Sequence, residues 1–263
     1  MKNSKILVVL SSASKIDLAD GKSMPTGFYL NELGVPAQRL AQAGYELVLA
    51  NPDGNTPAMD ASSDDDSFFS KDKQLHQEIK SFVFGLPGFQ APNPLEAILE
   101  GGLDDYAGIF IPGGHAPMQD LICNPQLGQI LRHFHQHGKP TAMICHGPAA
   151  ALSAQADPVA YLASLKAGRA AEAQDWIYAG YKMTVFSNIE ERQAEMKFPA
   201  HLQFHIESAL KTAGANMDTS LIPMQSKIVH DRELVTGQNP FSDGELSMRL
   251  LAMLEARIGA IRT

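Results

Sequence analysis

The sequence predicts an α/β protein with a flavodoxin-like, doubly wound and mostly parallel sheet, helices on both faces of the sheet and a short insertion. Two observations predict this fold. Short aliphatic runs alternate along the chain with stretches of helical periodicity. The aliphatic runs are almost continuously apolar, which is typical of parallel strands buried on both faces. A chain of 263 residues can bury a core without disulfides, and we interpret residues 1–263 as one domain.

The first part of the chain predicts a strand, a helix and a second strand. Residues 6–10, Ile-Leu-Val-Val-Leu, form the first expected strand. Residues 30–43 repeat leucine and alanine at helical spacing, with Pro36 near the start of the helix or at a kink. Residues 46–50 form the second expected strand, which ends at the turn-forming residues 51–54.

Residues 55–95 form the irregular part of the sequence and are interpreted as an insertion. They contain a run of aspartates and several prolines. A solvated loop and a lid over a functional site both stay open, because long insertions in compact domains are often functional. Phe82, Phe84 and Phe89 alternate as in a strand; exposed instead, they would form an apolar patch that suits a client protein or a second subunit.

The second half of the chain continues the alternation. Its expected strands are residues 109–111, 141–144, 183–186, 227–229 and 233–236. Its expected helices are residues 126–137, with Asn124 as N-cap, Pro125 in the first turn and Gly138 as C-cap, and residues 241–258, with Ser242 or Asp243 near the cap. No repeat, low-complexity tract or linker interrupts this pattern, which favours a single domain.

The composition excludes several classes of protein. A net charge of −8 without a run of Lys or Arg lacks the basic surface of a nucleic-acid-binding protein. The apolar run at residues 6–10 is far shorter than a membrane span or the core of a secretory signal, so we expect a cytoplasmic protein without a membrane partner. Two cysteines, Cys123 and Cys145, form neither a disulfide framework nor a zinc ribbon, and Cys123 is interpreted as a packing residue.

The strongest functional signal surrounds Cys145. An apolar strand, residues 141–144, stops at this cysteine, and His146-Gly147-Pro148 leads into a helix rich in small residues. This is the layout of a strand–turn–helix nucleophile elbow at the carboxyl end of a sheet, where open α/β folds place their ligands. A helix N-terminus behind the sulfur favours thiolate over thiol, which makes Cys145 a candidate nucleophile or a target of peroxide. The alternative is a buried structural cysteine.

A second signal follows the strand expected at residues 109–111. Gly113 and Gly114 come directly before His115, and consecutive glycines let backbone N–H groups approach a ligand, as in an oxyanion hole. We therefore predict Gly113, Gly114 and His115 as a segment that binds the substrate and its oxyanion. The glycine fingerprint of dinucleotide enzymes does not follow the first strand, so no such cofactor is expected.

Three closely spaced histidines, His133, His135 and His137, suggest a metal cluster. At a spacing of two residues on a helix, neighbouring members of the set point to different faces. A site with three ligands needs all of them to converge on one point. The sequence therefore predicts no metal site.

Six segments spread along the chain form a known combination. They are Gly113-Gly114-His115, Asp120-Leu121, Gly138-Lys139-Pro140, Cys145-His146-Gly147-Pro148, Thr26-Gly27-Phe28-Tyr29-Leu30-Asn31-Glu32-Leu33 and the stretch 234–242. Together they resemble the PfpI-like superfamily, also called class I glutamine amidotransferase-like. The segment around Glu32 resembles its branch of small heat-shock chaperones and glutathione-independent glyoxalases. The resemblance extends from residue 6 to about residue 255.

The resemblance implies roles for three side chains. Cys145 matches the nucleophile of the family, and His146 matches the histidine beside that nucleophile. Glu32 matches the carboxylate that contacts the sulfur. Without the resemblance, Glu32 would be interpreted as a carboxylate on the surface of a helix. The resemblance therefore moves Glu32 into the predicted catalytic site.

The resemblance also implies the remaining parts of the site. The oxyanion donors of the family map onto the backbone of Gly114 and His146. A third acidic residue orients the histidine; Glu190 and Glu191 both stand at its place, and we assign this role to Glu190. The sequence departs from the family at Ala116, where many relatives have glycine, and the third acidic residue varies within the family.

The function implied by the resemblance is a cysteine-dependent conversion of small 2-oxoaldehydes. Cys145 would add to the aldehyde as a hemithioacetal, and Glu32 or His146 would move a proton between neighbouring carbons, with Glu32 as the expected shuttle. A carboxyl group beside a thiolate is a like-charge pair, so one of the two should hold a proton. The expected reaction turns methylglyoxal into lactate, as a glyoxalase III-type lyase (hydro-lyase) without glutathione, metal or another cofactor.

Other functions stay open. The family also implies a deglycase, a hydrolase that acts on early glycation adducts. A holding chaperone of the stress response would use an apolar surface and need no nucleophile. A cysteine peptidase or amidase would need an aligned triad, for which the adjacent Cys145 and His146 are an unusual starting point. The family further implies a homodimer.

Overall fold

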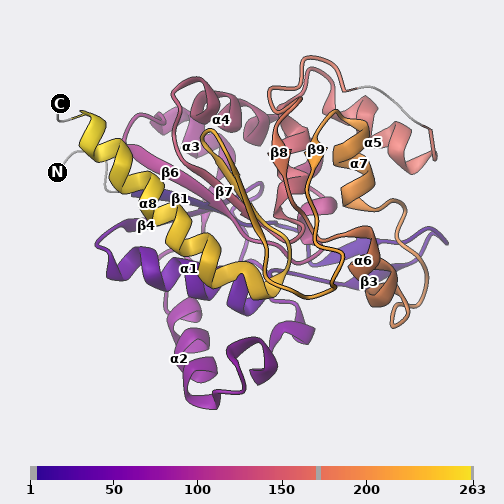
Figure 1. Cartoon of the computed structure of the whole chain (residues 1–263), viewed down its shortest axis with the longest axis horizontal. Coiled ribbons are helices and arrows are strands. Elements are labelled where there is room, and N and C mark those ends of the chain that lie inside the picture. The colour runs from indigo at the N-terminus through magenta and orange to yellow at the C-terminus, as the bar shows by residue number, and fades with distance from the viewer. Residues whose placement is uncertain (1–4, 170–172, 262–263) are drawn as a thin grey trace.

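A mostly parallel sheet forms the centre of the protein in a computed structural model that describes residues 5–169 and 173–261. Within these residues a seven-stranded sheet has the order β10–β11–β7–β6–β1–β4–β5 (Figure 1). Its strands are β1 (Lys5–Val9), β4 (Glu46–Asn51), β5 (Asn93–Pro94), β6 (Tyr106–Ile111), β7 (Thr141–Ile144), β10 (Ile228–Asp231) and β11 (Leu234–Gly237). Neighbouring strands are parallel except β10 and β11. The part β4–β1–β6–β7–β11 has the flavodoxin-like order, which confirms the predicted fold class.

Helices cover both faces of the sheet, as the sequence predicts (Figure 1). One face carries α1 (Leu30–Gln42), α2 (Lys73–Phe84) and α8 (Asp243–Ile261), and the other carries α3 (Leu95–Gly101), α4 (Pro125–Gln136) and the 3₁₀ helix η5 (Gly147–Ala154). Asn124 caps α4 by accepting the N–H of Leu127, and Pro125 is its first residue, as predicted. Among the described residues, no helix has both the length and the apolar character needed to cross a membrane.

Smaller elements surround the carboxyl edge of the sheet. The helices are α5 (Pro158–Lys166), α6 (Asn188–Glu195), α7 (Ile206–Thr212), η1 (Ala61–Ser63), η2 (Asp66–Phe69), η3 (Ala116–Met118), η4 (Leu121–Cys123) and η6 (Pro240–Ser242). Two short ribbons accompany them, β2 (Lys15–Asp17) with β3 (Ser23–Pro25), and β8 (Lys182–Met183) with β9 (Asn216–Met217).

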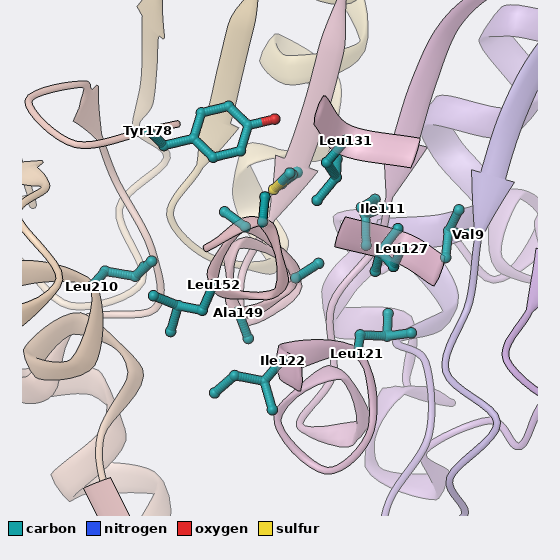
Figure 2. Close-up of a cluster of buried hydrophobic side chains, with 14 of the residues drawn as sticks. Val9, Ile111, Leu121, Ile122, Leu127, Leu131, Ala149, Leu152, Tyr178 and Leu210 are labelled. Carbon is teal, nitrogen blue, oxygen red and sulfur yellow. The ribbon is translucent and has the colours of Figure 1, made fainter. Parts of the chain in front are cut away.

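Alternate residues of the central strands supply two separate apolar cores. In β1, Val8 belongs to the core beneath α1, α2 and α8, whereas Leu7 belongs to the core beneath α3, α4 and η5. Figure 2 shows part of the second core, to which Ile111 of β6, Leu131 of α4 and Leu152 of η5 all belong. Because both faces of the sheet are buried, the central strands are apolar throughout, and the sequence shows continuous runs instead of alternation.

Two predictions about local structure are wrong. Residues 183–186 do not form a strand of the central sheet, because β8 is only two residues long and pairs with β9. The insertion at 55–95 is not irregular throughout, because it contains α2. Asp72 caps this helix by accepting the backbone N–H groups of Gln74 and Leu75. Asp72 is thus the N-cap of a helix that begins at Lys73 and that was not expected from the sequence.

The phenylalanines of the insertion do not lie on a strand. Phe82 and Phe84 belong to α2, and Phe89 follows the helix and is buried. The apolar face of α2 packs on α1, where an added Cβ at Gly34 would lie 2.3 Å from Ile79. A continuous exposed patch of all three aromatic rings therefore does not form, although Phe84 is 41% exposed.

The carboxyl ends of the parallel strands meet at one edge of the sheet. Cys145 directly follows β7, Gly113 follows β6, and Glu32 lies in the first turn of α1. The strand order reverses between β1 and β6, which is the switch point where open α/β sheets bind ligands. The fold therefore brings three predicted site residues, distant in sequence, to the place where this topology binds ligands.

Candidate active site

Cys145 occupies a strained turn between β7 and η5. Its φ of 59° lies in the left-handed region, which costs a non-glycine residue roughly 1–3 kcal/mol. Its N–H donates to the carbonyl oxygen of Gly237 at 2.9 Å, and its carbonyl accepts the N–H of Phe186 at 3.0 Å. At Gly147 an added Cβ would lie 2.5 Å from the carbonyl oxygen of Ile111, so only glycine lets the chain turn this close to β6. The turn is therefore held from both sides.

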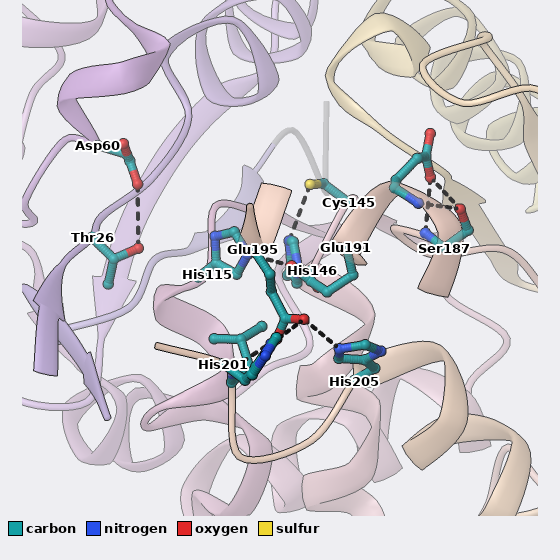
Figure 3. Close-up of polar contacts among 12 residues, drawn as sticks. Thr26, Asp60, His115, Cys145, His146, Ser187, Glu191, Glu195, His201 and His205 are labelled. Carbon is teal, nitrogen blue, oxygen red and sulfur yellow. Dashed lines mark hydrogen bonds and ion pairs between the residues drawn. The ribbon is translucent and has the colours of Figure 1, made fainter. Parts of the chain in front are cut away.

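A line of polar contacts leads from the sulfur of Cys145 through His146 to Glu191 (Figure 3). Cys145 Sγ lies 3.2 Å from His146 Nδ1, and His146 Nε2 lies 2.6 Å from Glu191 Oε2. Burial alone would raise the pKa of Glu191, but the charges and hydrogen bonds of His146 and His115 outweigh burial and lower that pKa. The ionised carboxylate accepts the Nε2–H of His146, so the lone pair of Nδ1 faces the thiol. His146 is thereby oriented as a base.

The acidic residue that orients His146 is Glu191, and the prediction of Glu190 is wrong. Glu190 instead closes the capping box of α6: its Oε2 accepts the N–H and the hydroxyl of Ser187, both at 2.8 Å. The side chains of Gln238 and Asn239 donate to the same carboxylate at 2.9 and 2.8 Å. A signal for this was present in the sequence. Serine followed three residues later by glutamate is a capping-box signature, which assigns Glu190 to the helix N-terminus.

His115 places a second imidazole on Glu191. Its Nε2 lies 2.8 Å from Glu191 Oε1, and its ring stacks on that of His146 with centroids 4.0 Å apart. Burial lowers the pKa of His115, but the charge and hydrogen bond of Glu191 outweigh it and raise that pKa. Burial and the charge of His115 lower the pKa of His146. Glu191 thus favours the charged form of His115, whereas burial and the charge of His115 favour the neutral form of His146. No sequence signal indicated this use of the His115 side chain.

Glu32 is fully buried beside Cys145. Its Oε2 accepts the N–H of Gly113 at 3.0 Å, and its Oε1 has no partner within the described residues. Burial raises the pKa of Glu32 to about 8, although hydrogen bonds from Cys145 and Gly113 act in the opposite direction. Glu32 therefore carries a proton at neutral pH, in keeping with the expectation that the carboxyl–sulfur pair holds one.

The predicted oxyanion-binding glycines have different roles. The N–H of Gly113 is used by Glu32, and an added Cβ there would lie 2.5 Å from Glu32 Oε2. Gly114 has a φ of 84°, and an added Cβ would lie closer than 2 Å to the carbonyl oxygen of Gly27. A hydrogen bond from the Gly114 backbone reaches the sulfur of Cys145 and acts to lower the thiol pKa. Of the two glycines, Gly114 is the one whose backbone faces the sulfur.

The thiol of Cys145 is not activated in the resting site. Burial raises the pKa of Cys145, the neighbouring Glu32 adds to this rise, and the hydrogen bond from Gly114 opposes it. The sequence predicts a thiolate favoured by a helix N-terminus. That prediction is wrong for this site, because the cysteine is only 3% exposed and desolvation of the anion dominates. A base must therefore remove the thiol proton during a reaction.

The start of the insertion supports the helix that carries Glu32. The N–H of Phe28 donates to the carbonyl oxygen of Ala58 at 2.9 Å. The hydroxyl of Ser63 accepts the N–H of Leu30 at 3.0 Å and so satisfies the first turn of α1 from a distant segment. This part of the insertion is neither a solvated loop nor a separate lid, because it is bonded to the chain on which Glu32 stands.

Two segments close over the histidines. The β2–β3 ribbon meets the segment after α6 through the bridge between Leu18 and Leu202, and Glu195 accepts the N–H of Leu202 at 2.7 Å. From the same segment, the ring of Phe198 meets His115 edge-on with centroids 5.4 Å apart. The two histidines are consequently buried, with His115 7% and His146 1% exposed.

One group of side chains in the site can hold a metal ion. Its members are His115, His146 and Glu191, whose ligand atoms all lie within 4.8 Å of one another. The histidines of α4 behave differently. His135 contacts Glu233 at 2.8 Å, while His133 and His137 stack on each other with centroids 4.1 Å apart. His135 thus turns away from the other two, as the sequence predicts.

The chain is similar to known proteins over most of its length. Residues 24–164 match the DJ-1/PfpI family. A Bos taurus protein, glutamine amidotransferase-like class 1 domain-containing protein 1, is 30% identical over 83% of this chain and 84% of its own length. The protein/nucleic acid deglycase HchA of Pseudomonas aeruginosa (strain UCBPP-PA14) is 24% identical over 96% of this chain and 81% of its own length.

A solved structure shows the same fold. The crystal structure of glyoxalase III from Candida albicans has a TM-score of 0.66 and 22% identity to this chain. The similarity covers 95% of this chain and 96% of that one. The described sheet and its flanking helices are therefore an arrangement found in solved proteins.

Proposed function

Because the chain belongs to the DJ-1/PfpI family, we propose that it is a cysteine-dependent enzyme that converts small 2-oxoaldehydes, with methylglyoxal as the substrate and lactate as the product. The observation that carries this proposal is the setting of Cys145, which lies between an oriented neutral base, His146, and a protonated acid, Glu32. The names of two relatives, a deglycase and a glyoxalase III, support chemistry on aldehydes or their adducts.

The first step forms a bond between sulfur and the aldehyde carbon. His146 Nδ1 takes the thiol proton as Cys145 Sγ attacks, and the electron pair of the carbonyl moves onto its oxygen. The backbone of Gly114, which faces the sulfur, stabilises that oxygen, and a proton from Glu32 completes the hemithioacetal. The imidazolium left on His146 is stabilised by Glu191.

The second step moves a proton between two carbons. Glu32, now ionised, takes the proton from the former aldehyde carbon while the imidazolium of His146 protonates the ketone oxygen, which gives an enediol. Glu32 then returns its proton to the neighbouring carbon, and His146 takes the hydroxyl proton from the former aldehyde carbon. The result is a thioester of lactate on Cys145. Water then attacks this thioester, lactate leaves with the new oxygen, and the sulfur recovers its proton. The balance is methylglyoxal plus water to lactate, with no oxidant or reductant.

Burial argues for a free aldehyde over a larger substrate. Cys145, His146 and Glu32 are each at most 3% exposed. A peptide needs a groove beside the nucleophile, so the aligned side chains do not favour a peptidase here. A deglycase acting on aldehyde adducts would use the same residues, but its substrate must reach the same buried sulfur. The class of the reaction, lyase or hydrolase, is therefore a matter for direct measurement.

The experiment is a proton NMR time course of methylglyoxal with the purified protein in D₂O, without a thiol cofactor. We expect lactate from the wild type and a loss of at least roughly 10³-fold in rate for Cys145→Ala. Deuterium at the lactate methine carbon would show that the proton on Glu32 exchanges with solvent before it returns, whereas a retained proton would show a transfer without exchange. Equal lactate formation by both proteins would contradict the proposal. A parallel run with the adduct of methylglyoxal and N-acetylcysteine distinguishes a deglycase.

A holding chaperone is the second candidate, and one observation favours it. Leu221 and Ile222 are 82% and 62% exposed, an unusual pair of neighbouring apolar side chains on a surface. These residues suit a client protein or a second copy of the chain in the expected homodimer. This function is supported if Cys145→Ala suppresses the aggregation of citrate synthase but the double variant Leu221→Ser/Ile222→Ser does not. Light scattering coupled to gel filtration would measure the oligomeric state.

A further inference from the structure

His115, His146 and Glu191 form a compact set of potential metal ligands that the proposed reaction uses only as a base and its support. Two imidazole nitrogens and a carboxylate converge, with all ligand atoms within 4.8 Å (Figure 3). The three side chains are 9%, 1% and 0% exposed, so they are already desolvated and held in place. They come from three different segments, after β6, after β7 and in α6.

The chemistry of this set favours a divalent transition metal. Two histidines and one glutamate are an established combination for Zn²⁺, whereas Mg²⁺ and Ca²⁺ prefer oxygen ligands. Ligands of a tetrahedral Zn²⁺ lie roughly 3.3 Å apart when each bond is near 2.0 Å. The present nitrogen–oxygen distances are 2.8 Å at His115 and 2.6 Å at His146. These two contacts go to different oxygens of Glu191, and they would have to widen by about 0.5 and 0.7 Å to make room for the ion.

We propose that His115, His146 and Glu191 bind one Zn²⁺ ion, or a similar divalent transition metal, and that this ion switches the enzyme off. Water supplies the fourth ligand on the side of His115, the most exposed of the three side chains. The binding of the ion is independent of the reaction, whereas the inhibition rests on the proposed function.

The inhibition follows from the position of a single proton. A metal ion on His146 Nε2 occupies the lone pair there, so the proton of the neutral imidazole must sit on Nδ1. Nδ1 is the atom that lies 3.2 Å from Cys145 Sγ. In that state it donates toward the sulfur and cannot accept the thiol proton. The sulfur itself is not a ligand, because it faces the opposite nitrogen of the ring.

Two other places within the described residues bring a pair of histidines together. His133 and His137 stand one turn apart on α4, with stacked rings. Glu195 lies 3.1 Å from His201 and 3.3 Å from His205, but the His201 side chain is 82% exposed. Neither place brings three ligand atoms together within the distance found at Glu191. Variants of these residues serve as matched controls.

The test is calorimetric titration of the metal-free protein with ZnCl₂, in wild type and variants whose folding is checked by circular dichroism. We expect one ion per chain in the wild type and an unchanged affinity in Cys145→Ala. We expect at least roughly 100-fold weaker binding in both His115→Gln and Glu191→Gln, which each remove one ligand. The controls His137→Gln and His205→Gln should bind as the wild type does.

Other outcomes of the titration overturn the proposal. Loss of binding in Cys145→Ala would show that the sulfur is a ligand. Loss in His137→Gln or His205→Gln would place the ion on a surface pair. Two variants of the proposed site are used so that a folding defect in one leaves the other informative. Co²⁺ gives a second readout, since a site without sulfur shows d–d absorption but no sulfur-to-metal charge-transfer band.

The effect on activity is measured separately. With lactate formation as the readout, one equivalent of Zn²⁺ should remove at least nine-tenths of the wild-type rate, and a chelator should restore it. Alkylation of Cys145 by iodoacetamide should slow in the Zn²⁺-loaded protein, because His146 Nδ1 can no longer accept the thiol proton; an unchanged rate of alkylation would contradict the proposed inhibition. If the wild type forms no lactate but binds one ion at this site, the metal site stands and the proposed reaction fails.

Discussion

Two buried glutamates flank the candidate site, and their surroundings drive them to opposite charge states. Glu32 and Glu191 are both 0% exposed. Glu32 has one backbone N–H on Oε2 and no partner on Oε1 within the described residues, and burial raises its pKa to about 8. Glu191 has an imidazole on each oxygen, and these two histidines lower its pKa despite the same burial.

The comparison teaches that burial does not decide the charge of a carboxyl group by itself. Desolvation acts on both glutamates with the same sign, and the number and charge of the hydrogen-bond donors decide the outcome. When the pKa values of two carboxyl groups are driven apart in this way, one group can donate a proton and the other can stabilise a charged base in the same site. Here Glu32 is the proton donor, and Glu191 stabilises the charged form of His146.

The largest effect on the free energy of unfolding is expected from Glu191→Gln, which removes the charge that both histidines contact. The protonated His115 then lies buried without its counter-ion, and we expect a loss of about 3–5 kcal/mol in the free energy of unfolding. The rate of lactate formation should fall at least roughly 100-fold, because the amide no longer stabilises a charged His146. Urea denaturation and the NMR assay measure the two effects.

Glu190→Gln is the matched control for that variant. The neighbouring glutamate holds the N-terminus of α6 and the side chains of Gln238 and Asn239, but it does not contact either histidine. Glu190→Gln should lower the free energy of unfolding, while the pH dependence of the rate of lactate formation stays that of the wild type. A loss of rate in Glu190→Gln larger than in Glu191→Gln would contradict the placement of Glu191 beside His146.

The next effect concerns stability as a function of pH in Glu32→Gln. The folded pKa of about 8 lies above the ordinary value of 4.5, so the folded wild type binds this proton more tightly than the unfolded chain does. The contribution of Glu32 to the free energy of unfolding is fully present below pH 4.5. It decreases as the pH rises and is lost above the folded pKa of about 8. Relative to the wild type, Glu32→Gln should therefore gain roughly 2 kcal/mol between pH 6 and pH 8.5 in urea denaturation.

The same variant separates charge from shape at the site. Glutamine keeps the acceptor for the Gly113 N–H, so the fold at pH 6 should be little changed, whereas lactate formation should be lost because the amide cannot release a proton. In the wild type, kcat/KM should fall as pH rises through about 8, where Glu32 loses its proton. A stability difference that does not depend on pH would contradict the buried, protonated Glu32.

The smallest effect is expected from Ser63→Ala, which tests the support of Glu32 by the insertion. The serine hydroxyl accepts the N–H of Leu30, and its loss should cost about 1 kcal/mol, or about 2–4 °C in Tm. Ser62→Ala is the matched control, since its hydroxyl contacts the side chains of Tyr29 and Asp60 and bonds to no backbone N–H of α1. Equal Tm values for both variants would show that the insertion does not stabilise α1.

Most of the sheet could be predicted from the sequence, because a strand buried on both faces leaves a continuous apolar run. β1, β4, β6 and β7 lie within a few residues of the predicted strands, and the predicted N-cap of α4, Asn124, is correct, whereas its C-cap is His137 and not Gly138. The helix α2 was missed because its apolar residues pack on α1 over only one face and are mixed with charged residues. The polar surroundings of residues 55–95 therefore hid a helix whose partner is distant in sequence.

By itself the sequence determined the fold class, the turn that carries Cys145 and, through the resemblance, the pairing of that cysteine with Glu32 and His146. These features are written in local periodicity, turn residues and short motifs. Only the tertiary structure decided which glutamate meets His146 and that His115 shares it. The contacts of Glu191 join residues 45 and 76 positions apart. The charge of each group depends on burial and on such distant partners, so adjacent residues in the sequence carry no direct record of it.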